Sequence, residues 1–394
     1  MPSFDLARAR RDTPACEQVI HFNNAGAALM PDPVVDAVIG HLQLEAAIGG
    51  YEAAERHAAA SERMYGATAA LIGATAPEIA FLESATRAWD QAFYAIPFRA
   101  GDRILTSVAE YASNYIAFLQ LVKRTGVGIT VIPDDAQGQI DLAALSAAID
   151  SRTRLISLTH MPSTSGLINP AAAVGRIARA AGVLYLLDAC QTVGQMDIDV
   201  QAIGCDFLSA TGRKYLRGPR GTGFLYVRAG IMDQLEPPVL DMHAATWVSR
   251  DAYVMRDDAR RFETWECSIA GKIGLAVALD YAHAWGMPAI GARVQALAAT
   301  LRQGLRPLPG VTVLDRGEHL GGIVTLTVDG HDPVDLRRRL HAHGINVSVA
   351  KQQATRLDLE SRGIESLLRA SVHYYNTEGE IERFCAGLAA VIKA

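Results

Sequence analysis

Residues 184–191 read LYLLDACQ, and residues 206–223 read DFLSATGRKYLRGPRGTG. Each stretch begins with an apolar run typical of a buried strand and ends in polar residues and glycines. Further runs of strand length, several of them separated by stretches with helical periodicity, occur at 79–82, 103–108, 128–133, 155–159 and 223–227. Strands that alternate with helices predict an α/β fold with a mostly parallel sheet covered on both faces. Ligands of such sheets lie beyond the carboxyl ends of the strands.

The pattern changes near residue 286. Two helices, 269–285 and 289–305, precede a mixture of short strands and helices that ends in a helix from about 378 to 392. This order is typical of a compact α+β domain. We predict an N-terminal segment 1–20 that packs on the small domain, a large domain 21–285 and a small C-terminal domain 286–394.

Composition excludes several classes of protein. The chain has 394 residues, a formal net charge of −5 and five cysteines. These values argue against a disordered chain, a disulfide scaffold and a dedicated nucleic-acid binder. No apolar stretch suffices for a membrane span and no secretory signal is visible, so we expect a cytoplasmic protein without membrane contact. We predict no metal site.

Asp188 and Lys214 carry the chemistry of the two quoted stretches. A buried carboxylate needs a cationic or hydrogen-bonding partner, and a protonated pyridine nitrogen is one. Lysine forms Schiff bases with carbonyl cofactors. Taken alone, Asp188 is explained as a strand-end cap and Lys214 as part of a basic, glycine-rich hairpin. Together they supply the two partners that pyridoxal phosphate requires.

Residues 82–89, LESATRAW, join a predicted strand to a predicted helix. A helix that starts at a Ser/Thr turn presents free backbone N–H groups and the positive end of its dipole, which together favour an anion. An ordinary Ser/Thr N-cap explains the same segment equally well.

With these motifs in place, the sequence resembles the class V aminotransferase group of fold-type I pyridoxal-phosphate enzymes, from residues 23–26 (NNAG) to residues 369–377 (RASVHYYNT). This group includes cysteine desulfurases, isopenicillin N epimerase and hercynylcysteine sulfoxide lyase. The resemblance implies a large domain with a mostly parallel seven-stranded sheet, a smaller α+β C-terminal domain, pyridoxal 5'-phosphate as cofactor, and a homodimer with active sites at its interface.

The resemblance also implies roles for single residues around the cofactor. Lys214 would form the Schiff base and move the substrate's α proton. Asp188 would pair with the pyridine nitrogen, Gln191 would donate to the ring oxygen, and Tyr111 would stack on the ring. The phosphate would be bound by Thr86, the Arg87 backbone, Thr211 and Arg213, with a weaker contribution from Ser268 of a neighbouring subunit. Ser163 would lie where relatives contact the ring oxygen, and a serine there would weaken that contact.

On the substrate side, the resemblance makes Arg369 the partner of an α-carboxylate, which implies an α-amino acid substrate. Asn24, Ala28 and Tyr51 would line the substrate pocket. Segments 49–55 and 262–268 would cross the dimer interface.

We predict the reaction from one segment in which the sequence departs from the desulfurases of this group. Desulfurases of this group use a loop cysteine, and the matching stretch 349–355, VAKQQAT, has none. We therefore predict that desulfuration is unlikely and that the enzyme is a lyase that performs α,β-elimination on an S-substituted cysteine or cysteine sulfoxide, as in the hercynylcysteine sulfoxide lyase branch. Epimerisation, transamination and a non-catalytic binding module remain the alternatives.

Overall fold

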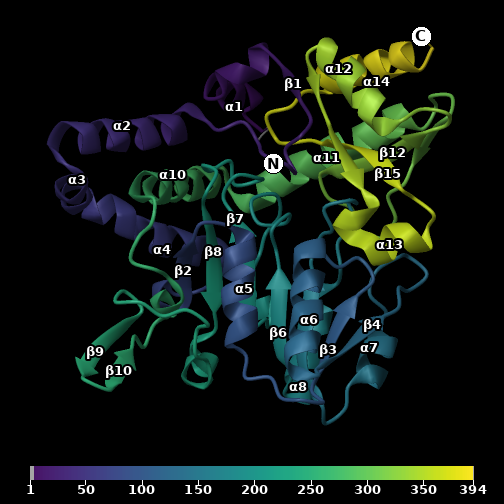
Figure 1. Ribbon diagram of the computed structural model, residues 1–394. Helices are drawn as coiled ribbons and strands as arrows, with labels where there is room; N and C mark the ends of the chain where they lie inside the picture. The colour runs from purple at the N-terminus through teal and green to yellow at the C-terminus, as the bar shows by residue number, and fades with distance from the viewer. Residues whose placement is uncertain (1–3, 394) are drawn as a thin grey trace.

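A seven-stranded sheet forms the centre of the computed structural model, which describes residues 4–393 (Figure 1). Its order is β2-β8-β7-β6-β5-β3-β4. The strands are β2 Ile79–Leu82, β3 Arg103–Ser107, β4 Gly128–Ile132, β5 Thr153–Thr159, β6 Leu184–Asp188, β7 Phe207–Thr211 and β8 Gly223–Val227. Neighbouring strands are parallel except at β8, which runs antiparallel to both β2 and β7. The predicted α/β class and the mostly parallel sheet are confirmed.

Helices cover both faces of the sheet because successive strand residues point to opposite sides. On β6, Leu186 packs with α5 (Ala85–Ala95) and α6 (Ala112–Thr125), which lie side by side in Figure 1. Leu187 packs on the other face with α4 (Ala58–Ile72), α8 (Ala171–Ala181) and α10 (Ile269–Trp285). Both faces are therefore dry, and the polar ends of the strands are left for a site.

A second, four-stranded antiparallel sheet follows α11 (Met287–Leu305), in the order β11-β12-β15-β14. Its strands are β11 Val311–Val313, β12 Ile323–Val328, β14 Ser348–Lys351 and β15 Ser366–Ser371, and helices α12 (Pro333–Ala342), α13 (Arg356–Ser361) and α14 (Glu378–Lys393) accompany it. The short strand β1 (Ile20–His21) pairs in parallel with β13 (Ile345–Asn346). The N-terminal segment thus joins the C-terminal part of the chain, while the exact domain limits at 20 and 286 stay predictions.

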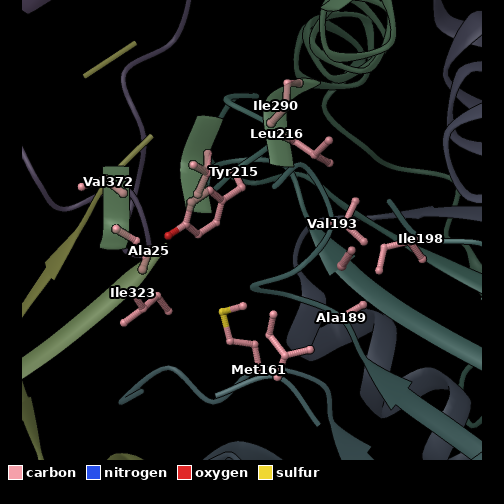
Figure 2. Close-up of a cluster of buried hydrophobic side chains, with 14 of the residues drawn as sticks. Ala25, Met161, Ala189, Val193, Ile198, Tyr215, Leu216, Ile290, Ile323 and Val372 are labelled. Carbon is pink, nitrogen blue, oxygen red and sulfur yellow. The ribbon is translucent and has the colours of Figure 1, made fainter. Parts of the chain in front are cut away.

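The loop after β7 is anchored in a hydrophobic cluster between the two sheets (Figure 2). Tyr215 and Leu216 are buried there with Met161, together with Ile323 of β12 and Val372, which directly follows β15. Because the two residues after Lys214 are core residues, the lysine is held in place by packing on both parts of the chain.

Two features project from the body on one side, as Figure 1 shows: helices α2 (Asp32–Ile48) and α3 (Gly50–Arg56), and a hairpin of β9 (Ala245–Ser249) and β10 (Ala252–Met255). The sequence did not predict the hairpin. Among the described helices, none combines the length and hydropathy needed to cross a bilayer.

Candidate active site

A cavity lies at the carboxyl ends of β5, β6 and β7, where this class of sheet places its ligands. Its walls come from the first turn of α5, the start of α6 and the loops after these strands. The lining residues are Glu83, Ser84, Ala85, Thr86, Tyr111, Asn114, Thr159, Met161, Ser163, Asp188, Cys190, Gln191, Thr211, Arg213, Lys214 and Gly221. The structure therefore brings the predicted cofactor residues together, with the exceptions of Arg87 and Ser268.

Asp188 is the last residue of β6 and is 7% exposed. Its Oδ1 accepts the backbone N–H of Cys190 at 3.0 Å, and its Oδ2 accepts Asn114 Nδ2–H at 3.1 Å. Burial raises the pKa of the Asp188 carboxyl, while these two hydrogen bonds and the charge of Lys214 oppose the rise. No Lys, Arg or His of residues 4–393 forms an ion pair with it, so a cationic ring nitrogen fits as its counter-ion.

Lys214 follows β7 by three residues and is 9% exposed. Its Nζ lies 3.2 Å from Cys190 Sγ and makes no ion pair within the described chain. Burial raises the pKa of the Cys190 thiol, and the charge of Lys214 opposes this. The lysine is thus buried, unpaired and directed into the cavity, as a Schiff-base lysine must be.

The amino end of α5 forms another wall. Ser84 is its N-cap, and Ser84 Oγ accepts the Arg87 N–H at 3.2 Å. The Arg87 N–H is therefore already used by an ordinary N-cap, whereas Ala85 and Thr86 line the cavity at the positive end of the helix dipole. Across the cavity, Thr211 Oγ1 donates to the Thr222 carbonyl at 3.1 Å.

Two arginines at or beside the cavity, Arg213 and Arg369, form no ion pair among residues 4–393. Arg213 lines the cavity, and its Nη1 is buried without a hydrogen bond to the described chain. Arg369, on β15, is 8% exposed; it donates to the Ser163 carbonyl at 2.8 Å and to Asn23 Oδ1 at 3.3 Å, and its Nε has no partner there. Burial lowers the pKa of Arg369 to about 10, and the charge of Arg213 adds to this effect.

Gln191 and Tyr111 face the cavity from two further loops. Gln191 Nε2 donates to the Ala25 carbonyl at 3.2 Å, and its buried Oε1 has no partner in the described chain. One amide hydrogen remains for a ring oxygen. Tyr111 is the N-cap residue of α6.

The other predicted substrate and phosphate residues are placed differently. Asn24 is fully buried and ties the N-terminal segment to β15 through Nδ2, which donates to the Ser371 carbonyl at 2.7 Å. The Ala28 N–H donates to the Arg213 carbonyl at 2.9 Å, beside the cavity. Tyr51, 78% exposed on α3, and Ser268, the N-cap of α10, do not line it. Within one chain, neither reaches Lys214.

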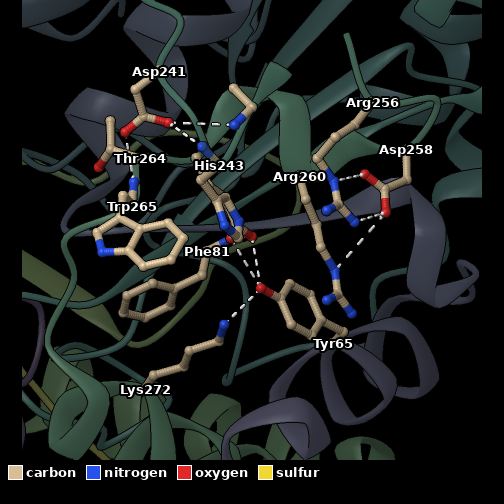
Figure 3. Close-up of polar contacts among 12 residues, drawn as sticks. Tyr65, Phe81, Asp241, His243, Arg256, Asp258, Arg260, Thr264, Trp265 and Lys272 are labelled. Atoms are coloured by element: carbon tan, nitrogen blue, oxygen red, sulfur yellow. Dashed lines mark hydrogen bonds and ion pairs between the residues drawn. The ribbon is translucent and has the colours of Figure 1, made fainter. Parts of the chain in front are cut away.

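A separate buried polar cluster joins the segment before the β9–β10 hairpin to α4, β2 and α10 (Figure 3). The Glu263 carboxylate accepts Tyr65 Oη–H at 2.9 Å, the Phe81 N–H at 2.7 Å and His243 Nε2 at 3.0 Å. Lys272 Nζ donates to Tyr65 Oη at 2.6 Å, and burial lowers the pKa of this lysine. The cluster fastens the loop before α10 to α4 and β2.

Sequence reasoning missed Glu110 and Asn114, which lie beside the site. Asn114 lines the cavity and contacts Asp188, and Glu110 accepts a hydrogen bond from Asn114 at 2.9 Å. One signal was available: Asn114 shares the i, i+4, i+7 face of α6 with Phe118 and Leu121, which are buried. A polar residue on that face needs a buried partner.

The residues present fit pyridoxal phosphate. A cationic ring nitrogen would satisfy Asp188, a phosphate would satisfy Arg213 and the first turn of α5, and a carbonyl would satisfy Lys214. The fold and this arrangement define a fold-type I pyridoxal-phosphate enzyme.

Comparison with known proteins supports the same class. The family model described as Aminotransferase class-V matches residues 20–384. A protein named "Probable cysteine desulfurase" from Methanothermobacter thermautotrophicus is 32% identical over 95% of this chain and 94% of its own. The apo structure of a cysteine desulfurase from Thermococcus onnurineus NA1 superimposes with a TM-score of 0.91 at 28% identity, covering 98% of each chain. A variant of C-DES with glycine covalently linked to its PLP cofactor shares the fold, with a TM-score of 0.87 at 21% identity over 96% of this chain and 98% of its own.

The chain belongs to the class-V aminotransferase family, and its cofactor is pyridoxal 5'-phosphate. The predicted reaction is wrong. The protein from Methanothermobacter thermautotrophicus and the solved structure from Thermococcus onnurineus NA1 cover nearly the whole chain and are named cysteine desulfurases, which overturns elimination on an S-substituted cysteine and gives no support to epimerisation. The prediction depended on the absence of a cysteine from one segment, 349–355. Such an absence does not exclude a sulfur acceptor from elsewhere.

Proposed function

We propose that the protein is a cysteine desulfurase, which removes the sulfur atom from L-cysteine and releases alanine. The balanced reaction is L-cysteine plus a thiol giving alanine plus a persulfide. The relatives' names support this reaction. The observation that carries the proposal is that Lys214 and Asp188 are buried at one edge of the sheet, line one cavity and form no ion pair with each other. Each is therefore available to the cofactor.

The bound cofactor supplies an electron sink for the substrate's α carbon. Lys214 holds the carbonyl end and afterwards moves a proton at that carbon. Asp188 keeps a positive charge on the ring nitrogen. Thr86, Thr211 and Arg213 hold the phosphate, and Arg369 holds the substrate carboxylate by its fork of N–H donors.

Product analysis tests this reaction. Purified protein loaded with pyridoxal phosphate is incubated with L-cysteine and a dithiol reductant, and alanine, sulfide and pyruvate are measured. We expect alanine and sulfide in equal amounts. Pyruvate in place of alanine would overturn the proposal, because it reports elimination without a sulfur acceptor.

Two lysine variants provide a matched comparison. Lys214 and Lys272 are buried to a similar extent, at 9% and 7% exposure, but only Lys214 lines the cavity. We expect Lys214→Ala to abolish alanine formation and Lys272→Met to retain it. Loss of alanine formation in Lys272→Met but not in Lys214→Ala would overturn this assignment, because it would place the Schiff base on Lys272.

We also infer that two copies associate through α2, α3 and the β9–β10 hairpin. These projecting elements carry exposed apolar residues, and the neighbouring loops add more: Ile39, Leu42, Tyr51, Met242, Trp247, Val248, Tyr253, Val254 and Trp265. Large apolar side chains gathered on projecting elements are typical of a contact with another protein. Association would also bring Tyr51 and Ser268 of one copy to the cavity of the other. Light scattering should give a dimer mass, and Trp247→Arg should lower it; a wild-type monomer at micromolar concentration would refute this inference.

A further inference from the structure

The side chain of Asn114 bridges two buried carboxylates. It lies in the first turn of α6 and is 2% exposed. One Nδ2 hydrogen goes to Asp188 Oδ2 at 3.1 Å, and the other goes to Glu110 Oε1 at 2.9 Å. An amide nitrogen has two hydrogens and accepts nothing, so this group can serve both carboxylates only as a donor.

Glu110 is itself held firmly. It is 3% exposed and forms no ion pair within residues 4–393. Its Oε2 accepts Thr106 Oγ1–H from β3 at 2.6 Å, and its Oε1 accepts Thr159 Oγ1–H from β5 at 2.5 Å. Oε1 also accepts the Tyr111 N–H at 2.8 Å. Two strands therefore fix the carboxylate to which Asn114 is attached.

Two hydrogen-bond donors, the Cys190 N–H and the Asn114 amide, orient the Asp188 carboxylate. The Cys190 N–H holds Oδ1 at 3.0 Å and Asn114 holds Oδ2, so both oxygens are fixed by donors from different segments. Without Asn114, burial would favour the neutral form of Asp188, which cannot stabilise a cationic ring nitrogen. Glu110 thereby serves two sides of the cavity, because it also fixes the backbone of Tyr111, the residue expected to stack on the ring.

We propose that Glu110 and Asn114 are positioning residues: Glu110 fixes the Asn114 amide, and that amide orients the Asp188 carboxylate toward the cofactor and favours its charged form. The inference rests on the proposed placement of Asp188 beside the ring nitrogen. Asn114 and Glu110 act through Asp188 and touch no reacting atom.

A double-mutant cycle tests the coupling. The variants are Asn114→Ala, Asp188→Asn and the two combined. The readouts are the cofactor's dissociation constant, from titration of apoprotein with pyridoxal phosphate, and the pH midpoint of the bound cofactor's visible absorption. We expect Asn114→Ala to weaken cofactor binding about tenfold, the usual effect of one hydrogen bond to a charged group, and to shift the pH midpoint. In the Asp188→Asn background the same change should have less than about twofold effect, because the charge it stabilises is gone.

Further variants separate positioning from simple loss of packing. Glu110→Gln keeps a carbonyl oxygen for Asn114 and should weaken cofactor binding less than Glu110→Ala. Gln139 supplies a matched control: it is also buried, at 6% exposure, and its Nε2 donates to the Ile168 carbonyl at 2.7 Å, away from the cavity. Gln139→Ala should lower the melting temperature of the apoprotein without shifting the pH midpoint.

The outcomes distinguish a failure of the proposed placement of Asp188 from a failure of the positioning role of Asn114 and Glu110. If Asp188→Asn changes neither the dissociation constant nor the absorption, the placement of Asp188 is wrong and the inference fails with it. If Asp188→Asn acts but the Asn114→Ala effect is undiminished in its background, the positioning role alone is overturned. A shifted pH midpoint in Gln139→Ala would overturn it as well.

Discussion

Substitution of Arg217 tests which contacts stabilise the loop after β7, which carries Lys214. It is 1% exposed and has a φ of 61°, a left-handed conformation that it alone adopts among the described non-glycine residues. Its Nε donates to the Leu29 carbonyl at 2.8 Å, its Nη1 donates to Tyr374 Oη at 2.7 Å, and its Nη2 donates to Thr13 Oγ1. Its backbone N–H donates to the Lys214 carbonyl at 2.9 Å and closes the turn.

Lost hydrogen bonds and relieved backbone strain have opposite effects on the free energy of unfolding when Arg217 is substituted. Arg217→Ala removes three buried hydrogen bonds, which costs about 3 kcal/mol of unfolding free energy. It keeps the backbone strain, because alanine is also disfavoured at positive φ. Arg217→Gly loses the same hydrogen bonds but relieves about 1 kcal/mol of strain. The glycine variant should therefore be the more stable of the two, against the usual trend at a buried position.

Thermal unfolding of the apoprotein measures this order. Unfolding entropy scales with chain length, so for 394 residues 1 kcal/mol corresponds to about 1 °C. We expect the midpoint to fall by about 3 °C in Arg217→Ala and by about 1 °C less in Arg217→Gly. A glycine variant that melts at or below the alanine variant would refute the argument from strain, and a fall below about 1 °C in both would refute the role of the hydrogen bonds.

Three further predictions concern the site and its surroundings. Cys190→Ala should retain most alanine formation, because burial raises the pKa of this thiol and leaves little thiolate to accept sulfur; loss of sulfur transfer with intact cofactor binding would instead make Cys190 the acceptor. Arg369→Gln should raise KM for cysteine by about tenfold or more and change cofactor affinity little, which steady-state kinetics and cofactor titration would check. Burial lowers the pKa of His160 from 6.5 to about 4, so the unfolded chain takes up this proton first and stability falls as the pH drops through that interval. The loss is up to about 3 kcal/mol, and urea unfolding at several pH values should show a shallower fall in His160→Gln.

The strands of the central sheet could be predicted because their signal is local. Each is a short apolar run between turn residues, and both faces of the sheet are buried. The hairpin 245–255 could not, because its apolar residues are exposed and follow no pattern of burial: Trp247 is 79% exposed. Its stability depends on contacts such as the cluster around Glu263, which joins segments nearly two hundred residues apart in sequence.

The site was predicted in part for the same reason. Asp188, Lys214 and the first turn of α5 follow strands directly, so their convergence at one edge could be inferred from the strand order. The contact between Glu110 and Thr159 could not be inferred, because it joins the ends of β3 and β5 and depends on how those strands are paired. The reaction was predicted wrongly because elimination and desulfuration share the lysine, the aspartate and the phosphate site.

The position of β8 has a consequence for how the protein is made. Strand β2 has a single neighbour in the central sheet, and that neighbour is β8, which the ribosome completes only after residues 83–222 have emerged. Until then β2 is an unpaired apolar edge, and the helix that follows it has no fixed relation to the lysine loop. Gly223 of β8 packs directly against the start of α5, because a Cβ atom there would lie 2.8 and 3.0 Å from backbone atoms of Ser84 and Ala85. The pairing of β2 with β8 therefore sets the start of α5 beside the lysine loop, and the phosphate site depends on a strand that lies far along the chain.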